Sequence, residues 1–186
     1  MYALGLLLLF PIISAQVATP PRPIGFVYNG GKSTAKVHVD IYIDLVCPDS
    51  RDAWPGVKAA ALHYGPDQLR LTVLLFPLPY HQNAFYASRA AYVIHKLSNG
   101  TKTFDWIERI LSQQLDALRD VNFHNKSDAD LLELFASLVT DMGFETDRFK
   151  ELTDRRSPND YERLTRVMWK YACTREFLTT SKLTVE

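Results

Sequence analysis

The residue best suited to chemistry in this sequence is Cys47, which opens a Cys-Pro-Asp-Ser segment that ends at Ser50. A thiolate can attack a disulfide sulfur and form a mixed disulfide. Pro48 favours the first turn of a helix, so we expect the sulfur at a helix N-terminus, where unpaired N–H groups and the helix dipole favour the thiolate. The negative charges of Asp49 and Asp52 oppose this effect. The alternative is a buried structural cysteine, because cysteine is among the most buried residue types.

Ser50 limits the chemistry that Cys47 can perform. In a Cys-x-x-Cys site, the second cysteine resolves the mixed disulfide that the first one forms. With serine in the second place, the first step stays possible, whereas release depends on a thiol from another molecule. The hydroxyl group of Ser50 is also placed to donate a hydrogen bond to the sulfur. The segment therefore predicts capture or reshuffling of disulfides by a single thiol, and not a self-contained dithiol cycle.

Four further side chains are candidates for tuning this site or forming a groove beside it. Asp44 precedes the motif and is either a buried carboxylate that tunes the thiol or a solvated acid. His81 follows a second apolar run, whose carboxyl end is expected on the same side of a parallel sheet as Cys47. It lies either near the thiol or on the surface. Trp54 and Tyr80 either wall a substrate groove or simply pack.

The chain has two cysteines and five histidines, and their spacing matches no recognisable zinc site. We therefore expect neither a metal nor another cofactor. Cys173 falls within a late helical pattern and is interpreted as a small, partly buried helical residue. A disulfide between Cys173 and Cys47 requires Cα atoms within about 7 Å, and nothing in the sequence places them so close. Their pairing stays an open alternative.

The elements expected around these residues form a β-α-β pattern. Residues 37–45 alternate between apolar and polar side chains, which is typical of a strand with one apolar face. A helical pattern then extends to residue 64, and residues 69–76 form the continuous apolar run of a buried parallel strand. This order predicts a right-handed crossover unit. A short strand is expected at residues 24–28, and the Asn-Gly pair at 29–30 suggests a turn back towards the first long strand.

Helical patterns fill most of the rest of the chain. The expected helical insertion covers about residues 83–156, and its apolar stripes are interpreted as packed core faces. One helix within it is expected to begin at Ser127, which forms a capping box with Asp130, and to end at Gly143. A last helix is expected to begin at Ser157-Pro158. The pattern predicts a helical layer larger than the sheet.

Together these segments resemble the DsbA-like branch of the thioredoxin superfamily, in which a strand delivers Cys-x-x-Cys or Cys-x-x-Ser to a helix. The matching residues are CPDSRDAWP at 47–55, FPLPYH at 76–81 and the helical insertion after them. The sequence is similar in particular to secretory eukaryotic members that carry Cys-Pro-Asp-Ser, over roughly residues 26–175. The resemblance implies an α/β fold, namely a thioredoxin-like βαβ sheet with a DsbA-type helical insertion. It also implies thiol–disulfide oxidoreductase activity with Cys47 and Ser50 at the site.

One departure from this family bears on function. The chain ends before the Thr-Pro loop with its cis-proline and before the closing strands that the resemblance implies, so the carboxyl-terminal strands are expected to be missing. The strand at residues 37–45 would then have an unpaired edge, which favours marginal stability and self-association. Residues 177–186 have some β-propensity and are expected to cover part of that edge at most. The second hypothesis is therefore a non-catalytic thioredoxin-like binding or structural protein, or an inactive truncated variant.

The start of the chain indicates a secretory route. Residues 1–15 contain a short apolar run followed by small residues, which is typical of a signal peptide, although the run lacks a preceding Lys or Arg. An uncleaved interfacial anchor is the alternative, since the run is too short to span a bilayer. Residues 16–25 form a linker and residues 26–186 the domain. We expect a secreted protein or one of the endoplasmic reticulum or endomembrane lumen.

Two sequons, at Asn99 and Asn125, fall between predicted helices, where an acceptor for N-glycosylation is exposed.

The chain has 186 residues, of which 47% are hydrophobic, and its formal net charge is zero. This composition fits one globular domain and does not favour binding to nucleic acid. The expected partners are thiols and disulfides of proteins or small molecules.

Overall fold

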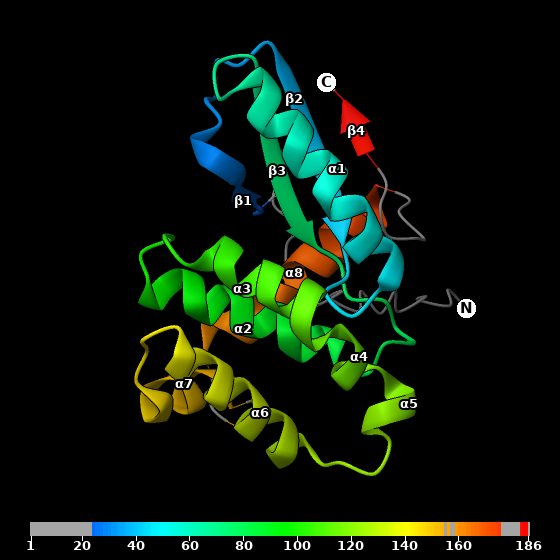
Figure 1. The fold of residues 1–186 in the computed structure, drawn as a ribbon, viewed down its shortest axis with the longest axis vertical. Coiled ribbons are helices and arrows are strands. Elements are labelled where there is room, and N and C mark those ends of the chain that lie inside the picture. Colours follow the sequence, from blue (N-terminus) through cyan, green and yellow to red (C-terminus); the bar gives the residue numbers. More distant parts are fainter. Residues whose placement is uncertain (1–23, 155, 157–158, 176–182, 186) are drawn as a thin grey trace, which may run out of the picture.

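The computed structural model describes residues 24–154, 156, 159–175 and 183–185. Their strands form one mixed sheet in the order β1-β3-β2-β4. The sheet occupies the upper part of Figure 1 with α1 beside it, and the helices of the insertion fill the lower part. The predicted fold class, a thioredoxin-like sheet with a helical insertion, is confirmed.

The centre of the sheet is the predicted β-α-β unit. Strand β2 (Val37–Ile43) pairs in parallel with β3 (Leu69–Leu75), in register from Val37↔Leu69 to Ile43↔Leu75. Helix α1 (Pro48–Tyr64) connects them and ends at Gly65, whose φ of 73° lies in the left-handed region that favours glycine. Because the strands are parallel, their carboxyl ends open at the same edge, where β2 runs into Cys47.

The two outer strands differ from the expectations. Strand β1 (Phe26–Val27) pairs antiparallel with β3 and does not turn back onto β2, so the predicted hairpin is wrong. The pair at 29–30 lies in a short 3₁₀ turn (Tyr28–Gly30). A hairpin to β2 needs a short loop that joins adjacent strands directly. Residues 31–36 instead carry the chain past β3 to β2.

The other edge of β2 is covered. Strand β4 (Leu183–Val185) pairs antiparallel with it, from Val39↔Val185 to Ile41↔Leu183. The expectation of an unpaired edge along these positions is therefore wrong, because a three-residue segment of suitable β-propensity satisfies the edge N–H and C=O groups. The backbone groups of β2 at Val39–Ile41 are therefore already paired with β4, so the reason for expecting self-association through them no longer holds.

The helical part of the chain begins after the loop that follows β3. Its successive elements are α2 (Ala84–Leu97), α3 (Thr103–Arg109), a π-helical segment (Ile110–Gln114), α4 (Leu115–Leu118), α5 (Asp120–Phe123), α6 (Asp128–Asp141), α7 (Thr146–Thr153) and α8 (Asp160–Thr174). The π-helical segment lies between α3 and α4, so the helical run from Thr103 to Leu118 is not one regular α-helix. None of the helices described in the structure is both long enough and apolar enough to cross a bilayer.

The ends of helices α6 and α8 can be compared with the capping residues that the sequence predicted. Ser127 and Asp130 form the predicted capping box at the start of α6, and Gly143 follows the helix with a φ of 84°. Helix α8 begins later than expected, because the side chain of Asn159 is the N-cap and accepts a hydrogen bond from the backbone N–H of Tyr161 at 3.1 Å. Ser157 and Pro158 lie outside the described residues. Asn is as good an N-cap residue as Ser, which explains the shift.

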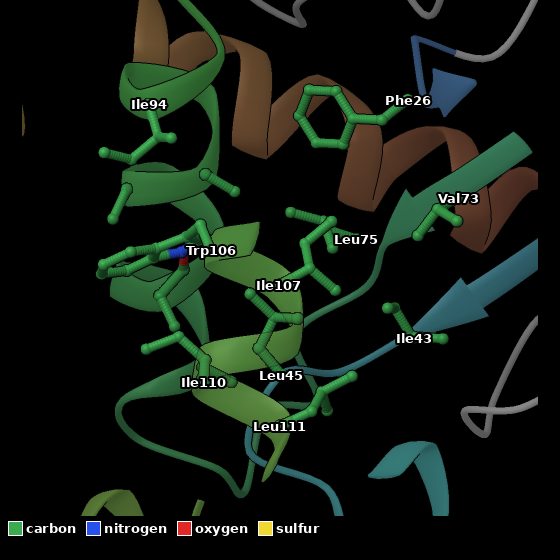
Figure 2. Packing of buried hydrophobic residues seen from close by; sticks show 14 of the residues in the cluster. Phe26, Ile43, Leu45, Val73, Leu75, Ile94, Trp106, Ile107, Ile110 and Leu111 are labelled. Atoms are coloured by element: carbon green, nitrogen blue, oxygen red, sulfur yellow. The ribbon is translucent and has the colours of Figure 1, made fainter. Parts of the chain in front are cut away.

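Alternation along β2 separates two apolar layers. Ile41 and Ile43 pack with α1 and with the insertion in the main core, whereas Tyr42 packs with α8 on the other face. Figure 2 shows side chains of Ile107 and Leu111 reaching towards Leu45 at the end of β2. The sheet and the insertion therefore share one core, which holds the strand end that leads to Cys47.

Candidate functional site

Cys47 is the N-cap residue of α1, with Pro48 in the first turn of the helix. Its backbone carbonyl accepts the first helical hydrogen bond, from the N–H of Arg51 at 3.1 Å. The residue is 5% exposed and belongs to a small apolar cluster on the α8 side of the sheet; the other members are Tyr42, Leu74, Phe76, Leu78, Met168, Tyr171 and Ala172. The sulfur thus combines a helix start with a mostly apolar environment.

Ser50 is fully buried in the first turn of α1. Its Oγ accepts a hydrogen bond from the backbone N–H of Asp44 at 3.1 Å. A hydroxyl group carries one proton besides its lone pairs, so Ser50 keeps a donor for a further partner. The serine ties the start of α1 to the strand end that precedes the motif.

Asp44 is a buried carboxylate and not a solvated acid. Its Oδ1 accepts from the N–H of Val46 at 2.6 Å, and its Oδ2 accepts from the N–H of Leu78 at 2.8 Å. The same Oδ2 lies 2.8 Å from Nδ1 of His81. Several donors around one buried carboxylate compensate the loss of its hydration. We call Asp44, Ser50 and His81, with the backbone groups they bind, the Asp44 clamp.

His81 is the titratable partner of Asp44 in this clamp. The hydrogen bond to Asp44 raises the pKa of the imidazole above its ordinary value, and partial burial offsets part of that rise. When the ring is protonated, it donates Nδ1–H to the carboxylate in a charge-assisted bond. The loop after β3 is therefore fastened to the strand end that carries Cys47, and a backbone bond from the N–H of Phe76 to the carbonyl of Ile43 reinforces it.

The remaining predicted residues lie in different environments. Trp54 is buried and stacks on Phe104, with ring centroids 6.1 Å apart, so it packs in the core. Its indole N–H has no hydrogen-bond partner among the described residues. Tyr80 is 62% exposed and its ring lies edge-on to His81 at 4.8 Å. Asp49 is exposed, so solvent screens its charge.

Cys173 occupies the last turn of α8, beside two members of the apolar cluster around Cys47. It is an exposed residue, yet partial burial of its thiol raises the pKa above the ordinary value. A raised pKa lowers the thiolate fraction at neutral pH and with it the reactivity. The two cysteines thus differ in backbone position, since only Cys47 lies at the start of a helix.

The sequence offered Trp54 and Tyr80 as possible walls of a groove, but neither lines the groove that the structure has next to this site, and the sequence did not predict the arginine at its base. The groove has a volume of about 640 Å³ and lies between the loop after β3 and helix α8. Arg89 contributes to it although its side chain is fully buried. Its position among alanines on the apolar stripe of α2 was the available signal, because a charge on such a stripe requires partners.

Both sequon asparagines are exposed in loops: Asn99 lies between α2 and α3, and Asn125 between α5 and α6. Among the residues that the structure describes, no group of His, Cys, Asp and Glu side chains is arranged to hold a metal ion.

Comparison with known proteins agrees with this architecture. The model of a thioredoxin family, Thioredoxin_4, matches residues 27–163. A sequence search of curated proteins found no match. Among solved structures, DsbA2 from Pseudomonas aeruginosa is similar with a TM-score of 0.66 and 15% identity, over 90% of this chain and 82% of that one. A putative protein-disulfide isomerase from Pseudomonas syringae gives 0.68 and 12%, over 88% and 87%. BdbD from Bacillus subtilis gives 0.66 and 16%, over 87% and 80%.

Proposed function

The chain belongs to the thioredoxin family, and from this premise we propose that it is a monothiol thiol–disulfide exchange protein with Cys47 as the nucleophile. The observation that carries the proposal is the position of Cys47 as the N-cap of α1, with Ser50 in the same helical turn. Unpaired N–H groups at this position stabilise negative charge on sulfur. Similar folds occur in DsbA2, in BdbD and in the protein from Pseudomonas syringae described as a putative protein-disulfide isomerase.

The proposed reaction has two steps. The Cys47 thiolate attacks one sulfur of a substrate disulfide, a new S–S bond forms, and the substrate bond breaks. The departing sulfur leaves as a thiolate and takes up a proton from water. A second thiolate, from the substrate or from a small-molecule thiol, then attacks the mixed disulfide and returns Cys47 to its starting state. The electrons balance without a further oxidant, so the outcome is a rearranged disulfide.

The Asp44 clamp supports the first step by positioning. Asp44 receives the N–H of Leu78 and the imidazole of His81, and its own N–H binds Ser50. These bonds hold the two segments beside Cys47 in one arrangement. Ser50 supports the step by retaining a hydroxyl proton that can be donated to sulfur. Asp49 and Tyr80 are exposed, Pro48 is half-buried, and none of the three enters the step.

The location we propose is the secretory pathway, either outside the cell or in the endomembrane lumen, as in the eukaryotic branch with Cys-Pro-Asp-Ser. The apolar start at residues 1–15, which lies outside the described residues, and the exposed sequons at Asn99 and Asn125 support it. A lumenal compartment also supplies the disulfides on which such a thiol acts.

The test is trapping with an oxidised small-molecule disulfide, followed by intact-mass measurement. The wild-type protein and Cys173→Ser are expected to form a mixed disulfide, whereas Cys47→Ser is expected to form none. Cys173→Ser is the matched control, because it removes the other sulfur. Equal adduct formation by the two variants would show that Cys47 has no special role.

One observation favours a second function, that of a non-catalytic binding protein. Cys47 is only 5% exposed, and burial in apolar surroundings makes a cysteine inert. Under this alternative, Cys47 alkylates no faster than a model thiol at neutral pH. The alkylation rate of the native protein therefore separates the two functions.

A further inference from the structure

The groove beside the candidate site lies between two segments, the loop after β3 and helix α8. The loop after β3 supplies Pro77, Leu78 and Pro79, and helix α8 supplies Trp169 and Lys170. Apolar walls with a few polar groups, within a volume of 300–1,000 Å³, are typical of ligand-binding pockets. The groove is therefore large enough for part of an extended peptide.

Both walls are connected to the surroundings of Cys47. Leu78 belongs to the apolar cluster that contains Cys47, and its backbone N–H is bound by Asp44. On the other wall, Trp169 stacks on Phe76 with ring centroids 6.3 Å apart, and Phe76 belongs to the same cluster. A segment lying in this groove would thus lie beside the apolar cluster that contains Cys47.

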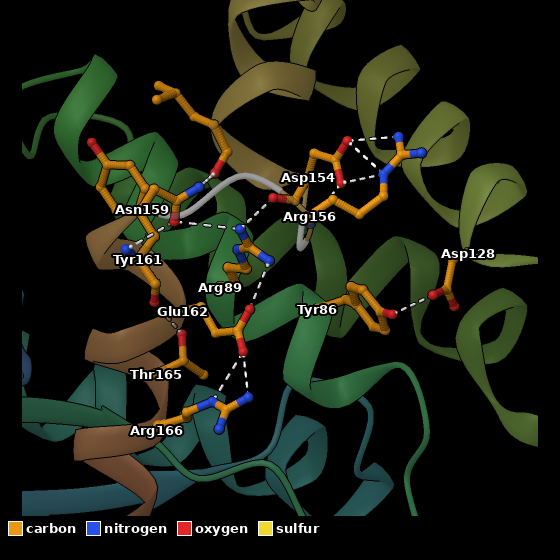
Figure 3. A network of polar contacts seen from close by, with 11 residues as sticks. Tyr86, Arg89, Asp128, Asp154, Arg156, Asn159, Tyr161, Glu162, Thr165 and Arg166 are labelled. Atoms are coloured by element: carbon orange, nitrogen blue, oxygen red, sulfur yellow. Dashed lines mark hydrogen bonds and ion pairs between the residues drawn. The ribbon is translucent and has the colours of Figure 1, made fainter. Parts of the chain in front are cut away.

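The charges in the groove are unequal. Arg89, Arg166 and Lys170 line it together with a single carboxylate, that of Glu162. Figure 3 shows that Glu162 lies between the two arginines, and its oxygens bind Nη1 of Arg89 at 3.4 Å and Nε of Arg166 at 3.0 Å. Among the described residues, Lys170 has no acidic partner.

The excess of basic over acidic side chains in the groove favours a negatively charged ligand. The guanidinium group of Arg89 is held in place by two further hydrogen bonds. Its Nη2 donates to the backbone carbonyl of Asp154 at 2.7 Å and to Oδ1 of Asn159 at 3.3 Å. Glu162 is the one carboxylate among the residues that line the groove, and Lys170 follows Arg166 by one helical turn on the same face of α8. His81, at the opposite wall, already has its carboxylate in Asp44.

We infer that this groove binds an acidic segment of the protein whose disulfide Cys47 attacks, so that the substrates are proteins with acidic residues near a disulfide. The inference rests on the proposed function and specifies its substrate class. The apolar walls accept the peptide backbone and apolar side chains, and Lys170 and Arg166 pair with the carboxylates. Such pairing favours the correct substrate mainly through encounter and orientation.

The test uses two synthetic peptides that carry their cysteine as a disulfide with 2-thiopyridine. They are identical except that the residues around the cysteine are Asp and Glu in one and Asn and Gln in the other. Attack by Cys47 of the Cys173→Ser protein forms the mixed disulfide and releases thiopyridone, whose absorbance gives the rate. We expect the acidic peptide to react about fivefold faster, and less so at high salt.

Two charge reversals on α8 locate the effect. Lys170→Glu is expected to abolish the preference for the acidic peptide. Arg163→Glu makes the same charge change on the same helix but lies outside the groove, and it is expected to keep the preference. Loss of the preference in both variants would indicate a general field and would overturn the inference.

Other results separate this inference from the proposed function. Equal rates for the two peptides in the Cys173→Ser protein without a charge reversal would overturn the acidic-segment inference and leave the exchange function intact. Failure of both peptides to react, although the unfolded protein reacts, would contradict the exchange function itself and the inference with it. A dimer in sedimentation that Lys170→Glu dissociates would place a second copy of this chain in the groove and would also overturn the inference.

Discussion

Asp44 and Arg89 are both fully buried ionisable residues, but their partners differ. Asp44 pairs with His81, whose charge changes near physiological pH, and it lies at the strand end that leads to Cys47. Arg89 pairs with Glu162, with the backbone carbonyl of Asp154 and with the amide oxygen of Asn159. One buried charge therefore links α2 to α8, whereas the other links the strand end before Cys47 to a histidine, the residue type that titrates closest to physiological pH.

The largest expected effect comes from removing the permanent charge. Arg89→Ala should lower the free energy of unfolding by about 3–5 kcal/mol, because it strands buried partners and leaves a cavity. Denaturant titration monitored by circular dichroism measures this change. Arg163→Ala on α8, where the side chain is exposed, should change stability by no more than about 0.5 kcal/mol.

If Arg89→Ala does not fold, Arg89→Lys provides the same information. Lysine keeps the charge but loses the forked geometry, so an intermediate loss of stability is expected. Stability equal to that of the wild type in both variants would mean that α2 and α8 are held together by apolar packing alone.

A smaller loss is expected from the other buried charge. Asp44→Asn keeps the shape of the side chain and one acceptor oxygen. Its NH2 group replaces the other oxygen and so faces an N–H group that donates a hydrogen bond to Asp44 in the wild type. We expect a loss of about 2 kcal/mol in unfolding free energy, because hydrogen bonds to a charged group are replaced. The reaction of Cys47 with a disulfide should slow as well. Unchanged exchange together with lower stability would limit Asp44 to a structural role.

The smallest expected effect is the pH dependence of His81. The pKa of this imidazole is raised in the folded state, so its stabilising contribution is complete below the unfolded value of about 6.5 and is lost as pH rises through the folded value. The contribution should be about 1 kcal/mol or less, since solvent screens the partly exposed ring. Unfolding titrations of the wild type and His81→Gln between pH 5 and 9 should converge at the alkaline end. Parallel curves would show that the clamp does not titrate.

The sequence predicted what depends on neighbouring residues. The alternation in β2, the helix start after Cys47 and the cap at Ser127 with Asp130 are local signals, and each is present in the structure. The pairing of β1 with β3 and of β4 with β2 joins segments that are far apart in the sequence, so local turn signals could not predict it.

The site shows the same limit. Asp44 and His81 were both candidates from the sequence, but their bond joins residues 37 positions apart, and only the fold brings them together. Cys47 was placed at a helix start by the proline after it. The partners of Arg89 were not predictable, because they come from the segment around α7 and α8 that closes over α2.

The central claim is that the environment of Cys47 makes it the reactive sulfur of this chain. Its most direct test is competitive alkylation of the native wild-type protein at pH 7 with a limiting amount of iodoacetamide, followed by peptide mapping of both cysteines. The account predicts that Cys47 is modified before Cys173 and faster than a model thiol. Modification of the exposed Cys173 first, with Cys47 reacting only after unfolding, would contradict it.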